Sequence, residues 1–161
     1  DQIKFSGSVV NGIGRHVELF VPGSGSVEKA PMDWPERLCP GSLNVRISRY
    51  PELFTERGLA LTTKTLDVAG FQPAFTIPQA VLGNNQLKAT LAMPHRGQGQ
   101  VWRAVLEVSG RNMPCWVLRR FGSGLADQLE LVSHKKMRDE LQLTRDKEWP
   151  AVVTVFGQWK D

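Results

Sequence analysis

Phosphate-binding chemistry is suggested first by the short segment Gly12-Ile13-Gly14, which stands where a strand-like run ends. Glycine has no side chain, so the backbone N–H groups of such a loop can approach a phosphate closely. Arg15 and His16 follow directly and could supply positive charge to a bound phosphate. The dinucleotide-binding fingerprint requires a third glycine where Val17 stands, so that fold is disfavoured. On these residues alone, a plain tight turn remains the alternative.

Ser42 and Asn44 place a hydroxyl and a carboxamide beside the turn-forming segment Cys39-Pro40-Gly41. Strand alternation puts both polar side chains on the face opposite Leu43 and Val45. Two neutral oxygen ligands at this spacing suit Mg²⁺, which fills its remaining positions with waters and nucleotide phosphates. The alternative is that both side chains only satisfy the backbone of the turn.

A basic run, Lys135-Lys136-Met137-Arg138, stands at the expected start of a helix. Positive side chains beside free backbone N–H groups form an anion site through the helix dipole, although a solvated basic turn is the simpler interpretation. The three histidines have no metal-ligand spacing, and neither a nucleophile elbow nor a Walker lysine is present. Metallohydrolases, serine hydrolases and P-loop enzymes therefore have no support.

Short β-branched runs, punctuated by 15 glycines and 10 prolines, predict that these residues are positioned mainly by strands. We expect a hairpin turn at Ser109-Gly110-Arg111-Asn112 and a helix from His134 to Leu141, capped by Ser133, with Met137 and Leu141 on one face. The expected strands cover residues 5–10, 16–21, 42–48, 100–108, 114–120, 128–132 and 151–156. Strands spread over the whole length, with one short helix near the C-terminus, predict a mainly β fold and a small closed barrel.

The chain of 161 residues has the size of a single domain, which we predict to span residues 1–161 with an insertion at about 50–99. The apolar runs are far shorter than the roughly 18 residues of a membrane span, so a membrane is not an expected partner. A formal net charge of +4 favours anionic partners. Two cysteines without a CxxC pattern predict reduced thiols and a cytoplasmic protein. The lack of an initiator Met suggests that the chain was trimmed or excised from a longer one.

Four segments, in their order along the chain, resemble the archaeal CTP-dependent riboflavin kinases. The resemblance covers roughly residues 3–48 and 100–157. The segments are Gly12-Ile13-Gly14, Pro40-Gly41-Ser42-Leu43-Asn44-Val45, Leu129-Glu130-Leu131-Val132 and Lys136-Met137-Arg138-Asp139. This chain departs from the family pattern at His16, where a further glycine is usual, and at His134, where proline is common.

The resemblance implies a six-stranded cradle-loop (RIFT-like) barrel that transfers the γ-phosphoryl group of CTP to the ribityl hydroxyl of riboflavin, giving FMN and CDP. It implies Mg²⁺ as the cofactor and, as partners, CTP or another nucleoside triphosphate together with riboflavin or a similar hydroxyl compound. Carried over by position, the nucleotide-binding residues are Gly12, Ile13, Gly14, Arg15, His16, Val17, Lys135, Lys136, Met137 and Arg138, the metal ligands are Ser42 and Asn44, and the flavin-binding residues are Ser123 and Glu130.

Two other kinds of function remain alternatives. A non-catalytic barrel that binds nucleic acid or a protein partner would also explain a sequence pI of about 9.3. An inactive relative that senses a ligand would explain the departure at His16. For Glu130, alternation with Leu129 and Leu131 predicts a side chain that faces away from whatever those two leucines pack against.

Overall fold

The computed structural model of the chain describes residues 1–10, 19–20, 37–38, 43–49, 51–56, 66, 70–77, 99–120, 127–133 and 135–160. Its elements, in chain order, are β1 (Gln2–Val10), β2 (Leu19–Phe20), β3 (Arg37–Leu38), β4 (Leu43–Arg49), α1 (Glu52–Glu56), β5 (Phe71–Gln72), β6 (Phe75–Ile77), β7 (Gly99–Val108), β8 (Arg111–Arg120), β9 (Gln128–Val132), α4 (Met137–Glu140), β10 (Trp149–Phe156) and β11 (Gln158–Trp159).

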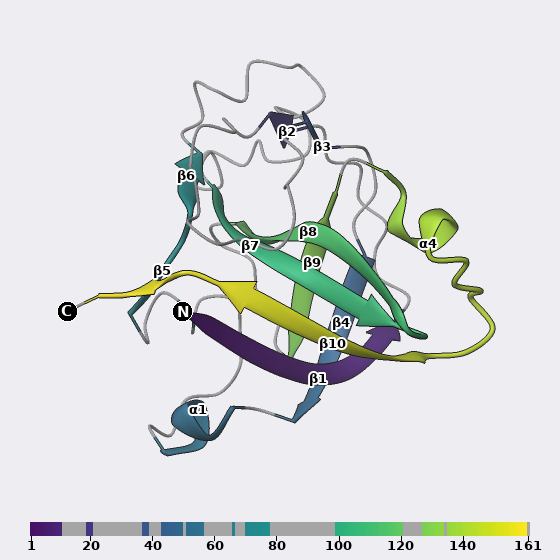
Figure 1. Ribbon diagram of the computed structural model, residues 1–161, viewed down its shortest axis with the longest axis horizontal. Helices are drawn as coiled ribbons and strands as arrows, with labels where there is room; N and C mark the ends of the chain where they lie inside the picture. The colour runs from purple at the N-terminus through teal and green to yellow at the C-terminus, as the bar shows by residue number, and fades with distance from the viewer. Residues whose placement is uncertain are drawn as a thin grey trace.

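Six strands form a closed antiparallel barrel in the order β10-β1-β4-β9-β8-β7, and a pairing of β10 with β7 closes it. Figure 1 shows these strands wound around one centre, with α4 at the end reached by the tip of β1. Closure leaves no free edge among the six long strands, because each finds a hydrogen-bonding partner on both sides. The predicted fold class, a mainly β chain that forms a six-stranded barrel with a short helix near the C-terminus, is confirmed.

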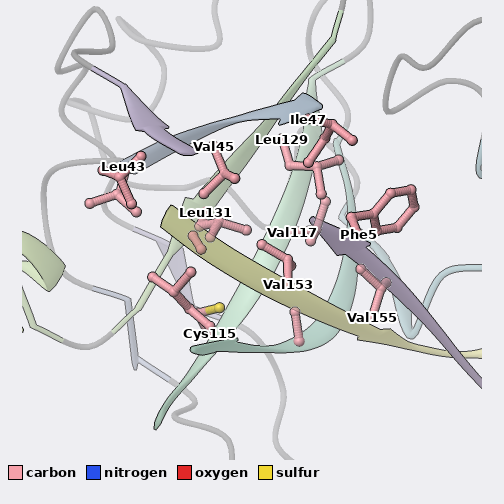
Figure 2. Close-up of a cluster of buried hydrophobic side chains, with 14 of the residues drawn as sticks. Phe5, Leu43, Val45, Ile47, Cys115, Val117, Leu129, Leu131, Val153 and Val155 are labelled. Carbon is pink, nitrogen blue, oxygen red and sulfur yellow. The ribbon is translucent and has the colours of Figure 1, made fainter. Parts of the chain in front are cut away.

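Strand alternation separates an inner face, which packs the core, from an outer face. In β4, Leu43, Val45 and Ile47 belong to the core cluster, while Arg46 and Ser48, on either side of Ile47, are exposed. Figure 2 shows the inner side chains of β1, β4, β8, β9 and β10 meeting in one cluster. Burying a side chain of this size stabilises the fold by about 1.5 to 3 kcal/mol, so the alternation fixes which face of each strand is inside.

Side chains also fill both ends of the barrel. At one end α4 and the residues after it bring Met137, Leu141 and Leu143 into the core cluster. At the other end the ring of Phe54 in α1 stacks on Phe5 of β1, with ring centroids 5.8 Å apart. The side chains described inside the barrel thus form a packed core.

The range 50–99, interpreted from the sequence as an insertion, contributes directly to this core. Phe54, Leu66 and Phe71 are fully buried in the core cluster. The indole Nε1 of Trp102, in β7, donates a hydrogen bond to the backbone oxygen of Phe71 at 3.1 Å. The helix α1 was not expected from the sequence.

The expected hairpin joins β7 and β8, but its turn is shorter than predicted, and the expected helix cap at Ser133 was wrong. The hairpin turn between β7 and β8 consists of Ser109 and Gly110 alone, with φ values of 52° and 74°, while Arg111 and Asn112 already pair in β8. Two positive φ angles in a two-residue loop match the right-handed twist of the strands, which explains the tighter turn. Ser133 does not cap a helix, because its hydroxyl donates to the backbone oxygen of Pro114 at 2.8 Å, and α4 begins later, at Met137.

Candidate functional site

Asn44 and Glu130, which the sequence assigned to a metal site and a flavin site, face each other across two neighbouring strands. Asn44 of β4 pairs with Glu130 of β9 on one side and with Val10, the last residue of β1, on the other. Directly opposed residues in antiparallel strands point to the same face, with Cβ atoms about 4.5 to 5.5 Å apart. Val10, Asn44 and Glu130 therefore form one row across three strands.

This row lies on the outer face of the barrel. Leu129 and Leu131, on either side of Glu130, belong to the core, so the Glu130 side chain faces away from it, as alternation predicted. Both polar residues of the row are nevertheless buried, with 4% of Asn44 and 6% of Glu130 exposed. An amide and a carboxylate removed from water need polar partners, so their position marks a polar site in an otherwise apolar surrounding.

Gln128 is a member of this site that the sequence reasoning missed. The Nδ2 of Asn44 donates to the Oε1 of Gln128 at 3.0 Å. Gln128 stands two residues before Glu130 in β9 and so shares its face. Period-two alternation around Glu130 could have indicated this residue, but its partner in β4 follows only from the strand pairing.

Arg138 connects α4 to the end of β1, beside the same row. Its Nη2 donates to the backbone oxygen of Val10 at 3.0 Å, and its Nη1 donates to the backbone oxygen of Thr144 at 3.3 Å. Burial, followed by the nearby charge of Arg145, lowers the pKa of the Arg138 guanidinium. A guanidinium stays protonated at neutral pH, so positive charge is held at the end of β1.

The other members of the basic run differ in their surroundings. Lys135 and Lys136 are exposed, and the Nζ of Lys135 lies 3.7 Å from the Oε1 of Glu140. Met137 is buried in the core cluster, so only its backbone is left to contact a ligand. Lys136 is the N-cap residue of α4 and makes no side-chain cap hydrogen bond.

The remaining predicted site residues lie outside the described residues: Gly12, Ile13, Gly14, Arg15, His16, Val17, Ser42 and Ser123. The site that the structure describes thus consists of Asn44, Gln128 and Glu130 on the strands and of Arg138 on α4.

The oxygen atoms of this site fit the expected magnesium ion in their chemistry. Within the described residues, no group of three or more His, Cys, Asp or Glu side chains is arranged to hold a metal. Mg²⁺ does not need such a cage, because it is commonly held by one or two protein oxygens together with waters and substrate phosphates. The amide oxygen of Asn44 is a hard donor of the kind it prefers.

Neither a scan against protein-family models nor a search of curated proteins finds a match to this chain. Among the residues that the structure describes, no helix has the length and the apolar character needed to cross a membrane.

Proposed function

We propose that this protein is a magnesium-dependent phosphotransferase of the CTP-dependent riboflavin kinase type, which transfers the γ-phosphoryl group of CTP to a hydroxyl of riboflavin or of a similar compound. The observation that supports the proposal best is the row of Val10, Asn44 and Glu130 with Arg138 at its end. Asn44 and Glu130, expected at the metal and at the flavin, are neighbours on one outer face, and Arg138, expected at the nucleotide, contacts the backbone of Val10 at the end of the same row.

In this proposal the chain acts mainly by positioning and by charge. The end of β1 leads into Gly12-Ile13-Gly14, whose N–H groups would bind the triphosphate, and the exposed Lys135 and Lys136 would draw it in. Asn44 would hold Mg²⁺ through its amide oxygen, with Ser42 as the second ligand, and the bound ion would neutralise charge on the phosphates. Glu130 would accept a hydrogen bond from the flavin substrate and orient it.

Incubating the protein with riboflavin, Mg²⁺ and each nucleoside triphosphate in turn, and separating the flavins by chromatography, tests this function. We expect FMN to form with CTP and to disappear when EDTA replaces Mg²⁺. Absence of FMN with every nucleotide, together with absence of heat on titrating riboflavin or CTP with Mg²⁺, would contradict the proposal.

The same measurements separate the proposal from its alternatives. Riboflavin binding without FMN formation would favour an inactive, ligand-sensing relative. A salt-dependent mobility shift with DNA or RNA would favour the nucleic-acid-binding alternative. Among the described residues, exposed Arg46 is paired with Glu148 at 3.0 Å, which reduces the positive charge that this part of the surface offers to a nucleic acid. The proposal includes a single domain and a cytoplasmic location, where both proposed substrates occur.

A further inference from the structure

We infer that Gln128 is a positioning residue that fixes the amide of Asn44, so that its oxygen and not its nitrogen is presented to the magnesium ion of the nucleotide. This inference rests on the proposed function and adds a residue that neither the motifs nor the resemblance assigned.

The two ends of the Asn44 carboxamide differ in their chemistry. Asn44 carries one atom that can bind a cation, Oδ1, and one that only donates hydrogen bonds, Nδ2. The two are nearly equal in size, so a free Asn44 could present either end. An amide that presented Nδ2 would turn a donor towards the cation and would not bind it.

The hydrogen bond from Asn44 to Gln128 selects one of the two orientations of this carboxamide. Nδ2 donates to the Oε1 of Gln128 at 3.0 Å, and the planar amide then turns Oδ1 away from Gln128. Since 4% of Asn44 is exposed, water offers little competition for this nitrogen.

Gln128 is itself held in place by its strand. It lies in β9 beside Leu129, which is fully buried in the core, so the backbone of Gln128 is anchored. Gln128 faces Arg46 in the β4–β9 register, two residues along the strands from the pair formed by Asn44 and Glu130. Its own side chain is half-buried, so the acceptor stands at the margin of the site, where it orients Asn44 without occupying the position of a ligand.

Two variants of similar size and shape test this role. Gln128→Met removes the acceptor, and Gln128→Glu keeps an acceptor that cannot donate. Calorimetry should measure CTP affinity with Mg²⁺ and with EDTA, because the ratio of the two isolates the contribution of the metal. In Gln128→Met we expect this ratio to fall about five- to tenfold, the range of a single hydrogen bond, with CTP affinity in EDTA unchanged. In Gln128→Glu the ratio should stay at or above the wild-type value.

The background variant Asn44→Asp provides the decisive control. A carboxylate has oxygen at both ends, so its orientation no longer matters, and adding Gln128→Met should then lower the ratio less than twofold. The thermal unfolding midpoints of all variants show whether each one folds.

The outcomes distinguish this inference from the function on which it rests. A wild-type protein whose CTP affinity does not depend on Mg²⁺ would contradict the proposed function. A wild-type dependence that persists in Gln128→Met would overturn the role of Gln128 alone. An equal fall in Gln128→Met and Gln128→Glu, or a fall in EDTA as well, would show a merely structural role and would likewise overturn it.

Discussion

Glu130 places a carboxylate on the outer face of β9, where 6% of the residue is exposed, between two leucines that point into the core. A buried carboxylate of this kind offers a strong hydrogen-bond acceptor to a neutral donor of a substrate. In the proposed function that donor belongs to riboflavin, whereas Asn44 opposite Glu130 serves the metal and its nucleotide.

Glu130→Gln should therefore fold normally and lose about tenfold or more in riboflavin affinity, with little change in CTP affinity, because a bond to a charged acceptor contributes about 1.5 to 3 kcal/mol. Titrations with each ligand measure the effect. Glu148→Gln, at an exposed residue paired with Arg46, is the matched control and should leave both affinities unchanged. Unchanged riboflavin affinity in Glu130→Gln, or an equal loss for both ligands, would remove Glu130 from the flavin site.

At the scale of the element, the pairing of β1 with β4 includes a bulge in β4, where Ser48 is left over between the partners of Ser6 and Gly7. The β1–β4 register shifts between Ser6 and Gly7, and beyond the shift Val9 pairs with Val45 and Val10 with Asn44. A Cβ atom on Gly7 would lie 2.0 Å from the backbone oxygen of Arg46. The backbone of β4 can thus approach β1 this closely only because Gly7 has no side chain.

Gly7→Ala should lower the free energy of unfolding by about 3 kcal/mol or more, because backbone of β4 would have to move. Urea denaturation measures the loss. Gly110→Ala is the comparison, since a Cβ there meets nothing within 4 Å and the cost is limited to its φ of +74°, about 1 to 2 kcal/mol. A loss in Gly7→Ala no larger than in Gly110→Ala would contradict the proposed clash.

The helix α4 ends in a Schellman motif without the usual glycine. The N–H of Leu143 donates to the oxygen of Arg138 at 2.8 Å, and the N–H of Gln142 donates to the oxygen of Asp139 at 3.2 Å. Gln142 takes the left-handed conformation that this motif requires, with φ at 56°. A residue with a Cβ atom is strained there.

Gln142→Gly should raise the free energy of unfolding by about 0.5 to 1 kcal/mol, because the relieved strain exceeds the added flexibility of the unfolded chain. For a chain of this size the thermal midpoint should rise by about 1 to 4 °C. Gln142→Ala retains the Cβ atom and should leave the midpoint nearly unchanged. Equal midpoints for the alanine and glycine variants would show that backbone conformation is not the cause.

At the scale of the whole molecule, Cys115 reports on the integrity of the barrel. Its thiol is free, fully buried and part of the core cluster shown in Figure 2. Burial raises the pKa of the Cys115 thiol far above its ordinary value, because the thiolate would lose its hydration in the core. The folded protein keeps this proton at a pH where the unfolded chain releases it.

The sign of the resulting pH dependence follows from proton release. Below the unfolded pKa of about 8.5 both states hold the proton, and the contribution of Cys115 to stability is complete. At higher pH only the unfolded state loses the proton, so this contribution should decrease by about 1.4 kcal/mol per pH unit. Urea unfolding of wild type and Cys115→Ala at several pH values, under reducing conditions, measures the difference. A difference that stays constant from pH 7 to pH 10 would contradict this prediction.

Local pattern was enough to determine the class of the fold and the facing of its strands. The spacing of Leu43, Val45 and Ile47 gave an inner and an outer face, because side chains alternate along any strand with a period of two. Local pattern also gave β9 its observed limits, Gln128 to Val132. The i, i+4 spacing predicted that Met137 and Leu141 share one face, and the structure places both in the core cluster. These features depend on neighbours in the chain, which the sequence displays directly.

Only the tertiary structure decided which outer residues meet. That Asn44 lies between Val10 and Glu130 follows from the order and register of three strands, and such pairings join positions far apart in the chain. The hydroxyl of Ser133 likewise donates its hydrogen bond to Pro114 of β8, instead of capping the helix that follows it in the sequence. This pairing too joins positions that are far apart in the chain. The local sequence of a strand does not specify its neighbour, because every strand offers the same backbone hydrogen-bonding groups. The order of the strands is set by the packing of all their side chains around one core.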